Sequence, residues 1–469
     1  MSARFDFDVV AIGGGAAGIV AANVAAGFGA RVALVERDRL GGECLWTGCV
    51  PSKALIHLAH LRRSGADGPA EPLAAVGAMV LRVQEAEGTE AALTRAGVAL
   101  RYGEGRFLDR HTFAMDDKTI RARHFVLATG SRPAVPDLPG LRQAGFLTNV
   151  EVFAQPAPPE SLIVIGGGLI GVELAQAFAR LGTRVTLLQR RERLLPRDDA
   201  ELVAELTALL RGEGLDIRCG ATPTRVELDG DRKRVHYRAG DGEHAVTAQE
   251  ILVAAGRRPN VEGLGLDALG IRIGAQGVET DATLRTRAPN IWACGDVRGV
   301  ARFSHMAEHE AKAAMRNILL PLRARARMDL VPWATFTDPE LAHAGLTEAD
   351  AAERGIAVDV FRQHFAEDDR ALVDGVGVGM VKLVAKRPGG QLLGAQILGP
   401  RAGELIQEAI LVLTRRGNIR EIADAIHVYP TLSIAVQRAA QRWYEALGKP
   451  PRMRALTRGY LGAWRAFQR

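Results

Sequence analysis

The chain has 469 residues, which is too long for one ordinary hydrophobic core and predicts roughly three domains. With 47% hydrophobic and 24% charged residues, it has the composition of a globular protein, and it lacks the apolar run of about 18 residues that would predict a transmembrane helix. The net charge of +6 is small, and no basic run with interleaved aromatic residues argues for nucleic-acid binding.

The first apolar strand pattern begins within a few residues of Met1, and no basic leader with a cleavage site precedes it. Four cysteines in a chain of this size do not make a secreted disulfide framework. We therefore expect a cytoplasmic protein.

A strand pattern over residues 9–12 runs into a glycine-rich turn and then into an alanine-rich helix pattern. This GxGxxG arrangement predicts a dinucleotide site, in which the free N–H groups of the helix start hold a pyrophosphate. The next strand pattern ends in an acid that suits ribose hydroxyls. The residues expected to hold this dinucleotide are Gly13, Gly15, Gly18 and Glu36.

Cys44 and Cys49 follow at once, with four residues between them. On the first turn and a half of one helix their sulfurs can come within bonding distance, which favours a redox pair. The helix start and Lys53 would both lower a thiolate pKa. The alternative is a pair of small buried thiols in a loop. Residues 65–88 have little pattern, and we expect a loop that leads into a helix.

A β-rich segment over residues 98–125 leads to a strand that ends at Thr129 and Gly130, which offer small groups to a flavin or nucleotide. The strand-turn-helix-strand pattern then repeats from residue 162, with Gly166, Gly168 and Gly171 in its turn. The chain therefore carries two dinucleotide-binding folds.

In the second fold the acid at the strand end is replaced by Gln189, which Arg190 and Arg191 follow. Basic residues here suit a 2'-phosphate, which favours NADPH. The alternative is a solvated arginine cluster, with NADH still accepted. Gly256 repeats the glycine strand ending, and Asp296 follows a strand where its carboxylate can accept a hydrogen bond from a cofactor hydroxyl.

The character of the chain changes at residue 331, where short strand patterns such as residues 376–384 and a helix near residues 404–415 predict a separate α+β domain. An amphipathic helix follows, and then a basic tail over residues 449–469. This tail is expected to be solvated surface, with contact between Trp464 and a membrane face or protein partner as the alternative.

Together these segments resemble the class I pyridine nucleotide-disulfide oxidoreductases, the family of dihydrolipoamide dehydrogenase, glutathione reductase and mercuric reductase. The pattern GGxCxxxxGCVPSK at residues 41–53 carries the resemblance, with AxGD at 293–296 and FTDPE at 336–340. The family implies an α/β fold with two Rossmann-like domains and a C-terminal α+β dimerisation domain. The implied divisions are an FAD-binding domain at 1–150 and 276–330, an NAD(P)-binding domain at 151–275 and the interface domain at 331–469.

The family also implies the roles of the site residues. Cys49 would be the charge-transfer thiol beside the flavin, and Cys44 the interchange thiol that attacks substrate. Lys53 and Glu173 would form an ion pair that tunes the flavin. The implied enzyme is a homodimer with a shared active site, which passes electrons from NADPH through FAD to the disulfide and then to a small molecule or metal ion.

One departure concerns the family's C-terminal His-Pro-Thr motif and the acid after it. Tyr429 and Ile434 stand at these positions, and we do not assign the catalytic role to His427, two residues earlier in a segment expected to be extended. In having a tyrosine at this position, the chain resembles mercuric reductase. That enzyme also hands over Hg(II) through a pair of cysteines near its C-terminus, and residues 463–469 contain no such pair. No resident metal site is predicted.

The substrate therefore stays open between a thiophilic metal ion and a disulfide. The first alternative is a dihydrolipoyl dehydrogenase-type enzyme that uses NAD. The second is a diaphorase, a quinone reductase or a redox partner protein with a vestigial disulfide.

Overall fold

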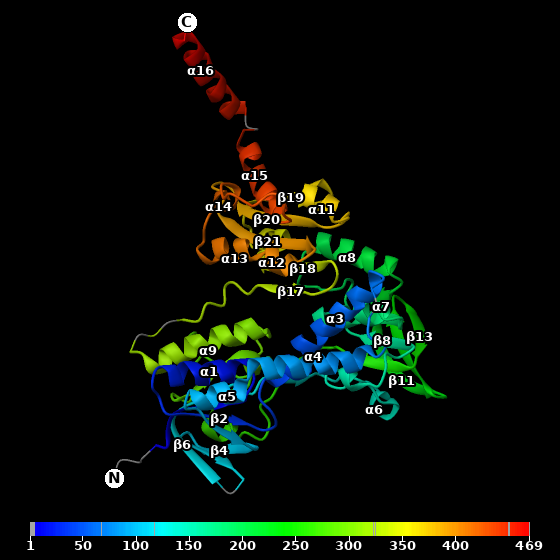
Figure 1. Cartoon of the computed structure of the whole chain (residues 1–469), viewed down its shortest axis with the longest axis vertical. Coiled ribbons are helices and arrows are strands. Elements are labelled where there is room, and N and C mark those ends of the chain that lie inside the picture. Colours follow the sequence, from blue (N-terminus) through cyan, green and yellow to red (C-terminus); the bar gives the residue numbers. More distant parts are fainter. Residues whose placement is uncertain are drawn as a thin grey trace. The chain divides into compact units, whose positions relative to one another are not determined.

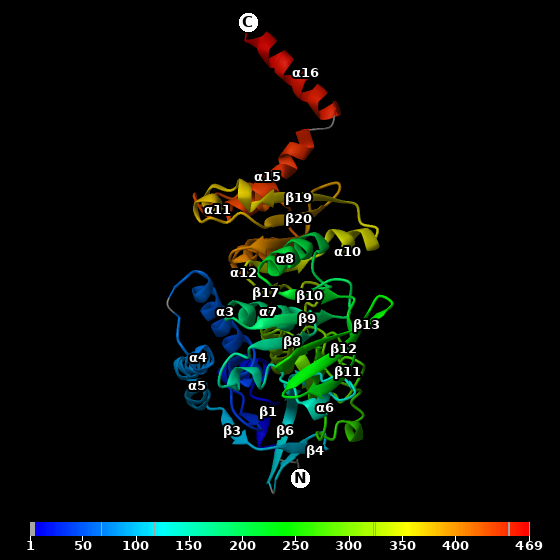
Figure 2. The same ribbon diagram turned by 90° about the vertical axis from the view of Figure 1, so that its right-hand side faces the viewer.

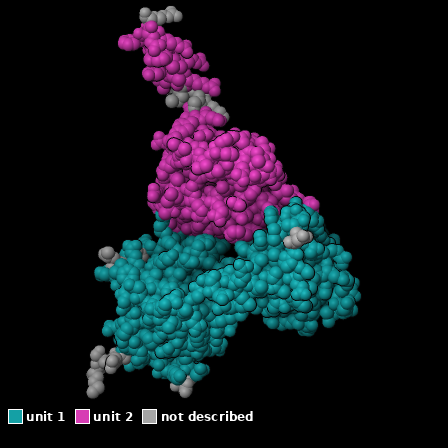
Figure 3. Space-filling model, viewed as in Figure 1, with its two compact units in different colours: residues 1–194, 213–328 teal, residues 195–212, 329–469 magenta. Residues whose placement is uncertain are grey.

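The computed structural model describes residues 5–66, 68–116, 118–321, 323, 325–448 and 451–468. The chain divides into two compact units, coloured separately in Figure 3. Unit 1 comprises residues 1–194 and 213–328, and unit 2 comprises residues 195–212 and 329–469.

The first sheet of unit 1 has seven strands in the order β3-β2-β1-β6-β5-β4, with β16 also paired to β6. Alternate residues of β1 face opposite sides of this sheet, as strand geometry requires. Val9 and Ala11 pack against α1 and α9, which lie side by side in Figure 1, whereas Val10 and Ile12 pack against a group of phenylalanines. The strands are β1 (Phe7–Ile12), β2 (Val32–Glu36), β3 (Ala99–Tyr102), β4 (Gly105–Asp109), β5 (Thr112–Met115), β6 (Lys118–Leu127) and β16 (Ile291–Ala293).

The pairing of β16 with β6 is parallel and places a late segment of the chain in the first sheet. This pairing supports the proposed return of residues 276–330 to the first domain. The helices of unit 1 are α1 (Ala16–Gly27), α2 (Gly42–Trp46), α3 (Cys49–Arg63), α4 (Pro72–Glu87), α5 (Thr89–Arg95), α6 (Leu141–Ala144), α7 (Leu169–Arg180) and α9 (Ser304–Leu319).

The second sheet of unit 1 is parallel, in the order β10-β9-β8-β14, and an antiparallel sheet of β11, β12 and β13 accompanies it (Figure 2). The β8-α7-β9 unit repeats the β1-α1-β2 unit of the first sheet. A short antiparallel pair, β7 with β15, joins the segments that follow the two sheets' glycine strand endings. The strands are β7 (Ser131–Pro133), β8 (Ser161–Ile165), β9 (Arg184–Gln189), β10 (Asp216–Cys219), β11 (Thr222–Asp229), β12 (Arg232–Ala239), β13 (Gly242–Ala248), β14 (Glu250–Val253) and β15 (Arg257–Pro259).

Unit 2 is built on an antiparallel sheet in the order β17-β18-β21-β20-β19. Helix α15 packs Ala435, Val436 and Ala439 into the core of this unit. The strands are β17 (Trp333–Thr335), β18 (Glu340–Gly345), β19 (Val358–His364), β20 (Met380–Lys386) and β21 (Leu392–Gly399), and the helices are α8 (Ala200–Gly212), α10 (Glu348–Glu353), α11 (Asp369–Val373), α12 (Ala402–Leu405), α13 (Gln407–Thr414), α14 (Arg420–Ala423), α15 (Ile434–Gly448) and α16 (Pro451–Phe467).

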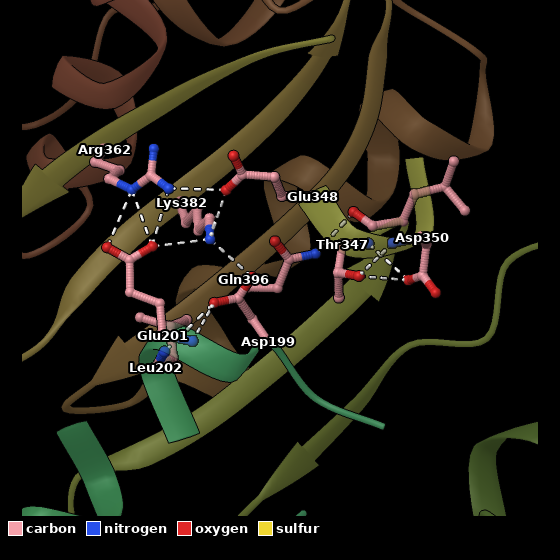
Figure 4. A network of polar contacts seen from close by, with 10 residues as sticks. Asp199, Glu201, Leu202, Thr347, Glu348, Asp350, Arg362, Lys382 and Gln396 are labelled. Carbon is pink, nitrogen blue, oxygen red and sulfur yellow. Dashed lines mark hydrogen bonds and ion pairs between the residues drawn. The ribbon is translucent and has the colours of Figure 1, made fainter. Parts of the chain in front are cut away.

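An ion network around Lys382 on β20 holds α8 to the sheet of unit 2 (Figure 4). The buried ammonium donates to Asp199 at 2.8 Å and to Glu201 at 2.9 Å, and it lies 3.1 Å from Glu348. Arg362 bonds both glutamates from β19. Burial alone would lower the pKa of Lys382, but the bonds to Asp199 and Glu201 raise it overall. The segment 195–212 therefore belongs to unit 2, although its sequence position follows β9 of unit 1.

Two expectations about local structure were wrong. Residues 72–87 form helix α4 rather than a loop, because Leu73, Val76 and Val80 recur at helical spacing and are buried on one face. The strand expected from residue 376 begins at Met380, after Gly379 with φ +91, a conformation that favours glycine. The predicted β-rich segment over residues 98–125 is confirmed as β3 to β6.

Candidate active site

Cys44 and Cys49 lie on two helices rather than on one. Cys44 is in α2 and Cys49 is the first residue of α3, with Gly48 between the helices. A side chain at Gly48 would place its Cβ 2.9 Å from the carbonyl oxygen of Glu43, so the break needs glycine. The prediction of a shared helix is therefore wrong, but the break still brings the two thiols together, since their side chains are hydrogen-bonded to each other.

The two thiols differ in their electrostatics. The hydrogen bond with Cys44, the contact with Ser304 and the charge of Lys53 lower the pKa of Cys49 to about 6, although burial opposes the shift. The same sulfur–sulfur hydrogen bond and burial raise the pKa of Cys44. At neutral pH the reduced pair is therefore a Cys49 thiolate that accepts a hydrogen bond from the Cys44 thiol. The Cys49 side chain is the more exposed of the two.

Ser304 is a site residue that the sequence did not reveal. Its hydroxyl lies 3.6 Å from the Cys49 sulfur and donates to it when that sulfur is ionised. The residue opens α9, so the N-terminal end of that helix also faces the thiolate and favours negative charge there. No local signal points to Ser304, because it lies 255 residues from Cys49 in the chain.

Lys53 and Glu173 form an ion pair within unit 1. The Lys53 Nζ donates to Glu173 Oε2 at 2.8 Å, joining α3 to α7. Glu173 is almost fully buried, whereas Lys53 is about one third exposed. Because Lys53 is on the same helix as Cys49, this pair fixes a positive charge close to the thiolate. Its predicted role in tuning a flavin stays a prediction.

A second polar chain begins at Glu43, the residue before Cys44. Arg257 donates to both carboxylate oxygens of Glu43 and to the Ser131 hydroxyl, which in turn donates to Asp296 at 2.6 Å. Burial raises the pKa of Asp296 above its usual range, against the effect of the Ser131 hydrogen bond and the Arg257 charge. The chain of contacts links the cysteine motif to the aspartate that was predicted to bind the cofactor.

The turn of the first dinucleotide fold fits a bound dinucleotide. Gly13 has φ +110, and a Cβ there would lie 2.3 Å from the carbonyl oxygen of Ala128. A Cβ at Gly18 would lie 1.8 Å from the carbonyl oxygen of Gly13. No described side chain caps the start of α1 at Gly15, which leaves its N–H groups facing the turn. Glu36 lies at the turn and accepts from Gly14 N at 2.5 Å.

The second turn reproduces this geometry. Gly166 has φ +119 with its Cβ position 2.4 Å from the carbonyl oxygen of Ala254, and Gly171 approaches the carbonyl oxygen of Gly166 as Gly18 approaches that of Gly13. Gly168 caps α7 with nearly the same backbone angles as Gly15, and no described atom lies within 4 Å of a Cβ placed there. Both turns can therefore hold a pyrophosphate.

The two dinucleotide folds differ in the residue at the end of the strand that follows the glycine turn and its helix. Gln189 is buried there and donates to the Arg193 carbonyl oxygen at 3.1 Å, where Glu36 presents a carboxylate in the first fold. Arg190 and Arg191 are exposed directly after it. An uncharged amide beside two accessible guanidinium groups is better suited to bind a phosphate than to bind a ribose diol.

The segments that follow the two predicted strand ends, at Gly130 and Gly256, are hydrogen-bonded to each other. Thr129 donates its hydroxyl to the carbonyl oxygen of Asn260 at 2.7 Å, and Asn260 N donates to Gly130 O at 3.0 Å. Gly130 and Gly256 both have positive φ. The side chain of Thr129 thus ties together the connections between the two folds, and its predicted contact with a cofactor stays a prediction.

Tyr429 belongs to unit 2 and is exposed. Its hydroxyl donates to Asp369 at 3.2 Å, and this hydrogen bond raises its pKa above the usual value. His427 is bonded to Glu408 at 2.9 Å, and its segment, residues 424–433, lies in no strand or helix rather than extended in a strand. Ile426 and Val428 in that segment are fully or largely exposed.

In the described part of the chain, no helix is long and apolar enough to cross a membrane. Within the same described ranges, no three His, Cys, Asp or Glu side chains gather as a metal-binding cluster.

Comparison with known proteins covers both units. A family model described as pyridine nucleotide-disulphide oxidoreductase matches residues 7–315, and that family's dimerisation domain matches residues 331–440. The chain is 34% identical to a mercuric reductase from Streptomyces lividans, over 96% of this chain and 98% of that protein. It is 35% identical to a dihydrolipoyl dehydrogenase from Thermus scotoductus, over 93% and 97%.

Among solved structures, the HOCl-induced flavoprotein disulfide reductase RclA from Escherichia coli superposes with a TM-score of 0.85 at 27% identity, over 92% of this chain and 99% of that one. LpdA from Mycobacterium tuberculosis gives the same TM-score and identity, over 93% and 99%. The predicted α/β fold with a C-terminal interface domain is thereby confirmed.

Proposed function

Because this chain belongs to the class I pyridine nucleotide-disulfide oxidoreductases, which are FAD-dependent enzymes, we propose that it uses NADPH to reduce a Cys44–Cys49 disulfide. The resulting dithiol then reduces a thiophilic metal ion or a disulfide. When bound, FAD supplies two-electron transfer between the nicotinamide and the cysteine pair. Gly13, Gly15, Gly18, Glu36 and Asp296 would hold the FAD.

The observation that carries the proposal is the asymmetric thiol pair. Two electrons break the sulfur–sulfur bond, and one proton taken up from solvent goes to Cys44. The pair is left with a thiolate on Cys49, whose pKa is lowered to about 6, and a thiol on Cys44. Lys53, paired with Glu173, supplies a positive charge that favours the Cys49 thiolate. A disulfide substrate would be attacked by Cys44, and the mixed disulfide would be resolved by Cys49 with release of the second substrate thiol.

Tyr429 favours a soft metal ion over dihydrolipoamide. A phenol whose pKa is raised by Asp369 does not act as a base at neutral pH, so Cys44 would receive little help in losing its proton. A soft metal ion needs less help, because its binding to two sulfurs itself displaces the proton. RclA has been solved as a Cu(II) complex, and that structure superposes on this chain with a TM-score of 0.86. Cu(II) should therefore be tested as a substrate beside Hg(II).

The C-terminal domain supports a homodimer, since its match is to the family's dimerisation domain. The exposed Ile426, Val428 and Tyr429 form an apolar surface that a partner subunit would cover. In the proposed enzyme, Tyr429 of the partner subunit completes the site at Cys44. A pair that cycles between dithiol and disulfide suits a reducing compartment, which makes the cytoplasm the proposed location.

Steady-state NADPH oxidation tests the substrate, in a panel of Hg(II), Cu(II), low-molecular-weight disulfides, lipoamide and quinones. We expect a metal ion or a disulfide to be reduced, with loss of activity in Cys44→Ser and Cys49→Ser. Quinone reduction that survives both substitutions unchanged, with no other substrate active, would favour a diaphorase with a vestigial disulfide.

The identity to dihydrolipoyl dehydrogenases keeps an NAD-linked lipoamide enzyme as the second candidate. Its signature would be rapid reduction of NAD by dihydrolipoamide that Tyr429→Phe abolishes. Such a result would contradict our reading of Tyr429 as a poor base.

The ratio of kcat/KM for NADPH and NADH tests the nucleotide. We expect NADPH to be preferred and Arg190→Glu to level or reverse the preference, since the change places a carboxylate where the 2'-phosphate would lie. Arg184→Glu, at the other end of β9 and also exposed, is the matched control and should leave the ratio unchanged. Equal use of both nucleotides by the parent protein would show that the arginines are only surface charge.

A further inference from the structure

Helix α16 presents an apolar face that no described part of the chain covers. Every residue from 454 to 468 is exposed, and the exposed set includes large apolar side chains: Leu456, Tyr460, Leu461, Trp464 and Phe467. Trp464 is half exposed and Phe467 is 92% exposed. The family's dimerisation domain ends its match at residue 440, so this helix (red in Figures 1 and 2) lies outside the part that the family explains.

Four of the five exposed large apolar residues share one side of the helix, and Leu461 lies next to the basic side. At about 100° per residue, Leu456, Tyr460, Trp464 and Phe467 fall within an arc of about 80°. The three arginines with described side chains, Arg454, Arg458 and Arg465, fall within about 40° on the opposite side of the helix. The helix is therefore divided into an aromatic face and a basic face.

The charge of this segment has one sign. Residues 446–469 carry six basic residues (Lys449, Arg452, Arg454, Arg458, Arg465 and Arg469) and no acidic residue. Of these, Lys449 and Arg469 lie outside the described residues. Helix α15 shows the contrast, because it contains Glu445 and buries Ala435, Val436 and Ala439 in the core of unit 2. An amphipathic pattern in α15 is thus satisfied within the protein, whereas that of α16 is not.

The helix also needs support from outside. Gly459 and Gly462 lie within it, and each costs about 1 kcal/mol of helix stability relative to alanine. An isolated helix of 17 residues with two glycines is marginal in water, and most helices gain their stability from packing of an apolar face. A surface that covers Trp464 and Phe467 would supply this packing.

We propose that α16 binds the surface of an anionic lipid bilayer and anchors the protein peripherally there. A basic face opposite Trp, Tyr, Phe and Leu is the pattern of helices that lie in the membrane interface, where anionic headgroups attract the arginines and the aromatic rings enter the acyl boundary. A second copy of α16 would cover the aromatic face but would supply no anionic group to the basic face, because residues 446–469 hold no carboxylate side chain. Nucleic acid would leave the aromatic face unexplained.

Co-sedimentation of the flavin-loaded, full-length protein with vesicles tests the proposal. We expect binding to vesicles of phosphatidylglycerol and phosphatidylcholine, weak binding to phosphatidylcholine alone, and weaker binding as salt rises. Replacing Arg454, Arg458 and Arg465 by Glu should lower the partition coefficient at least 100-fold. The matched control makes the same change at three exposed arginines of unit 1, Arg82, Arg95 and Arg142, and should retain most of the binding.

The aromatic face has its own test. Trp464→Ser with Phe467→Ser should lower binding at least tenfold while the charge is unchanged, and quenching by brominated lipid should disappear with Trp464→Phe. NADPH oxidation should be unaltered in all of these variants, which separates loss of membrane binding from misfolding. Equal binding of the parent and the triple Glu variant, or concentration-dependent self-association through α16 without vesicle binding, would overturn the proposal.

Discussion

Replacing Ser304 by Ala tests the claim that the Cys49 thiolate is stabilised from a distant helix. The substitution removes the hydroxyl that lies 3.6 Å from the Cys49 sulfur but leaves the Cys44 hydrogen bond and the Lys53 charge in place. A single hydrogen bond to a partly exposed ion is worth about 1 kcal/mol or less, so the Cys49 pKa should rise from about 6 to roughly 6.5–7.

The assay is the pH dependence of Cys49 alkylation by iodoacetamide in the pre-reduced protein, with each cysteine quantified by mass spectrometry. The thiolate is the reactive species, so reactivity appears as pH rises through the pKa. Near pH 6 we expect Ser304→Ala to react roughly threefold more slowly than the parent, whereas above pH 8 the two should react equally. Cys44, whose pKa is raised, should remain the less reactive thiol throughout.

Two control variants separate the hydrogen bond from a change in packing. Ser304→Thr keeps a hydroxyl and should keep the parent midpoint. Ser52→Ala removes a hydroxyl one turn along α3 that donates to the Cys49 carbonyl oxygen rather than to the sulfur, and it should also keep that midpoint. A parent midpoint near 8.5–9, or a Ser304→Ala midpoint equal to the parent's, would refute the argument.

Further predictions concern the ion network of Lys382 in unit 2 and the two glycine turns of unit 1. Lys382→Met leaves three carboxylates without their buried partner and should lower the free energy of unfolding by about 3–5 kcal/mol in denaturant melts, whereas Met at exposed Lys386 on the same strand should be near neutral. Because the pKa of Lys382 is raised and those of two partner glutamates are lowered, this stabilisation should hold between about pH 5 and pH 10 and be lost outside that range; a Lys382→Met effect that is flat across pH would contradict it. Gly13→Ala should lose bound flavin and Gly166→Ala should keep flavin but lose NADPH binding, since each new Cβ meets a backbone carbonyl oxygen. Gly27→Ala, with no described atom within 4 Å, should keep both, and full flavin content in Gly13→Ala would sink the assignment of the first turn.

Unit 1 supplies both thiols, the ion pair of Lys53 with Glu173 and the two dinucleotide turns. Tyr429, for which a role in the partner's site is proposed, belongs to unit 2, where its hydroxyl donates to Asp369. Substrate choice in the proposed enzyme therefore depends on a residue that the thiol chemistry of unit 1 does not specify.

Features that depend on residues close together in the chain could be predicted from the amino-acid sequence. Both glycine turns were predicted, because the backbone of a tight turn before a helix restricts nearby positions to glycine, as the contacts of Gly13 and Gly166 show. The spacing of Cys44 and Cys49 predicted a thiol pair, although the helix break at Gly48 between them was missed. The same local rules predicted the strands on which these turns stand, apart from their ends.

The distant groups that act on the thiols could be identified only from the folded chain. The contact of Ser304 with Cys49, and that of Arg257 with Glu43, join residues more than 200 positions apart. No periodicity encodes such contacts, because they depend on how separate sheets and helices pack. Likewise, the segment 195–212 follows a strand of unit 1 in sequence but belongs to unit 2. The buried ammonium of Lys382 pairs with Asp199 of this segment and holds the segment there. Local spacing fixed the turns and the cysteine pair, and the long-range packing of charges fixed their surroundings.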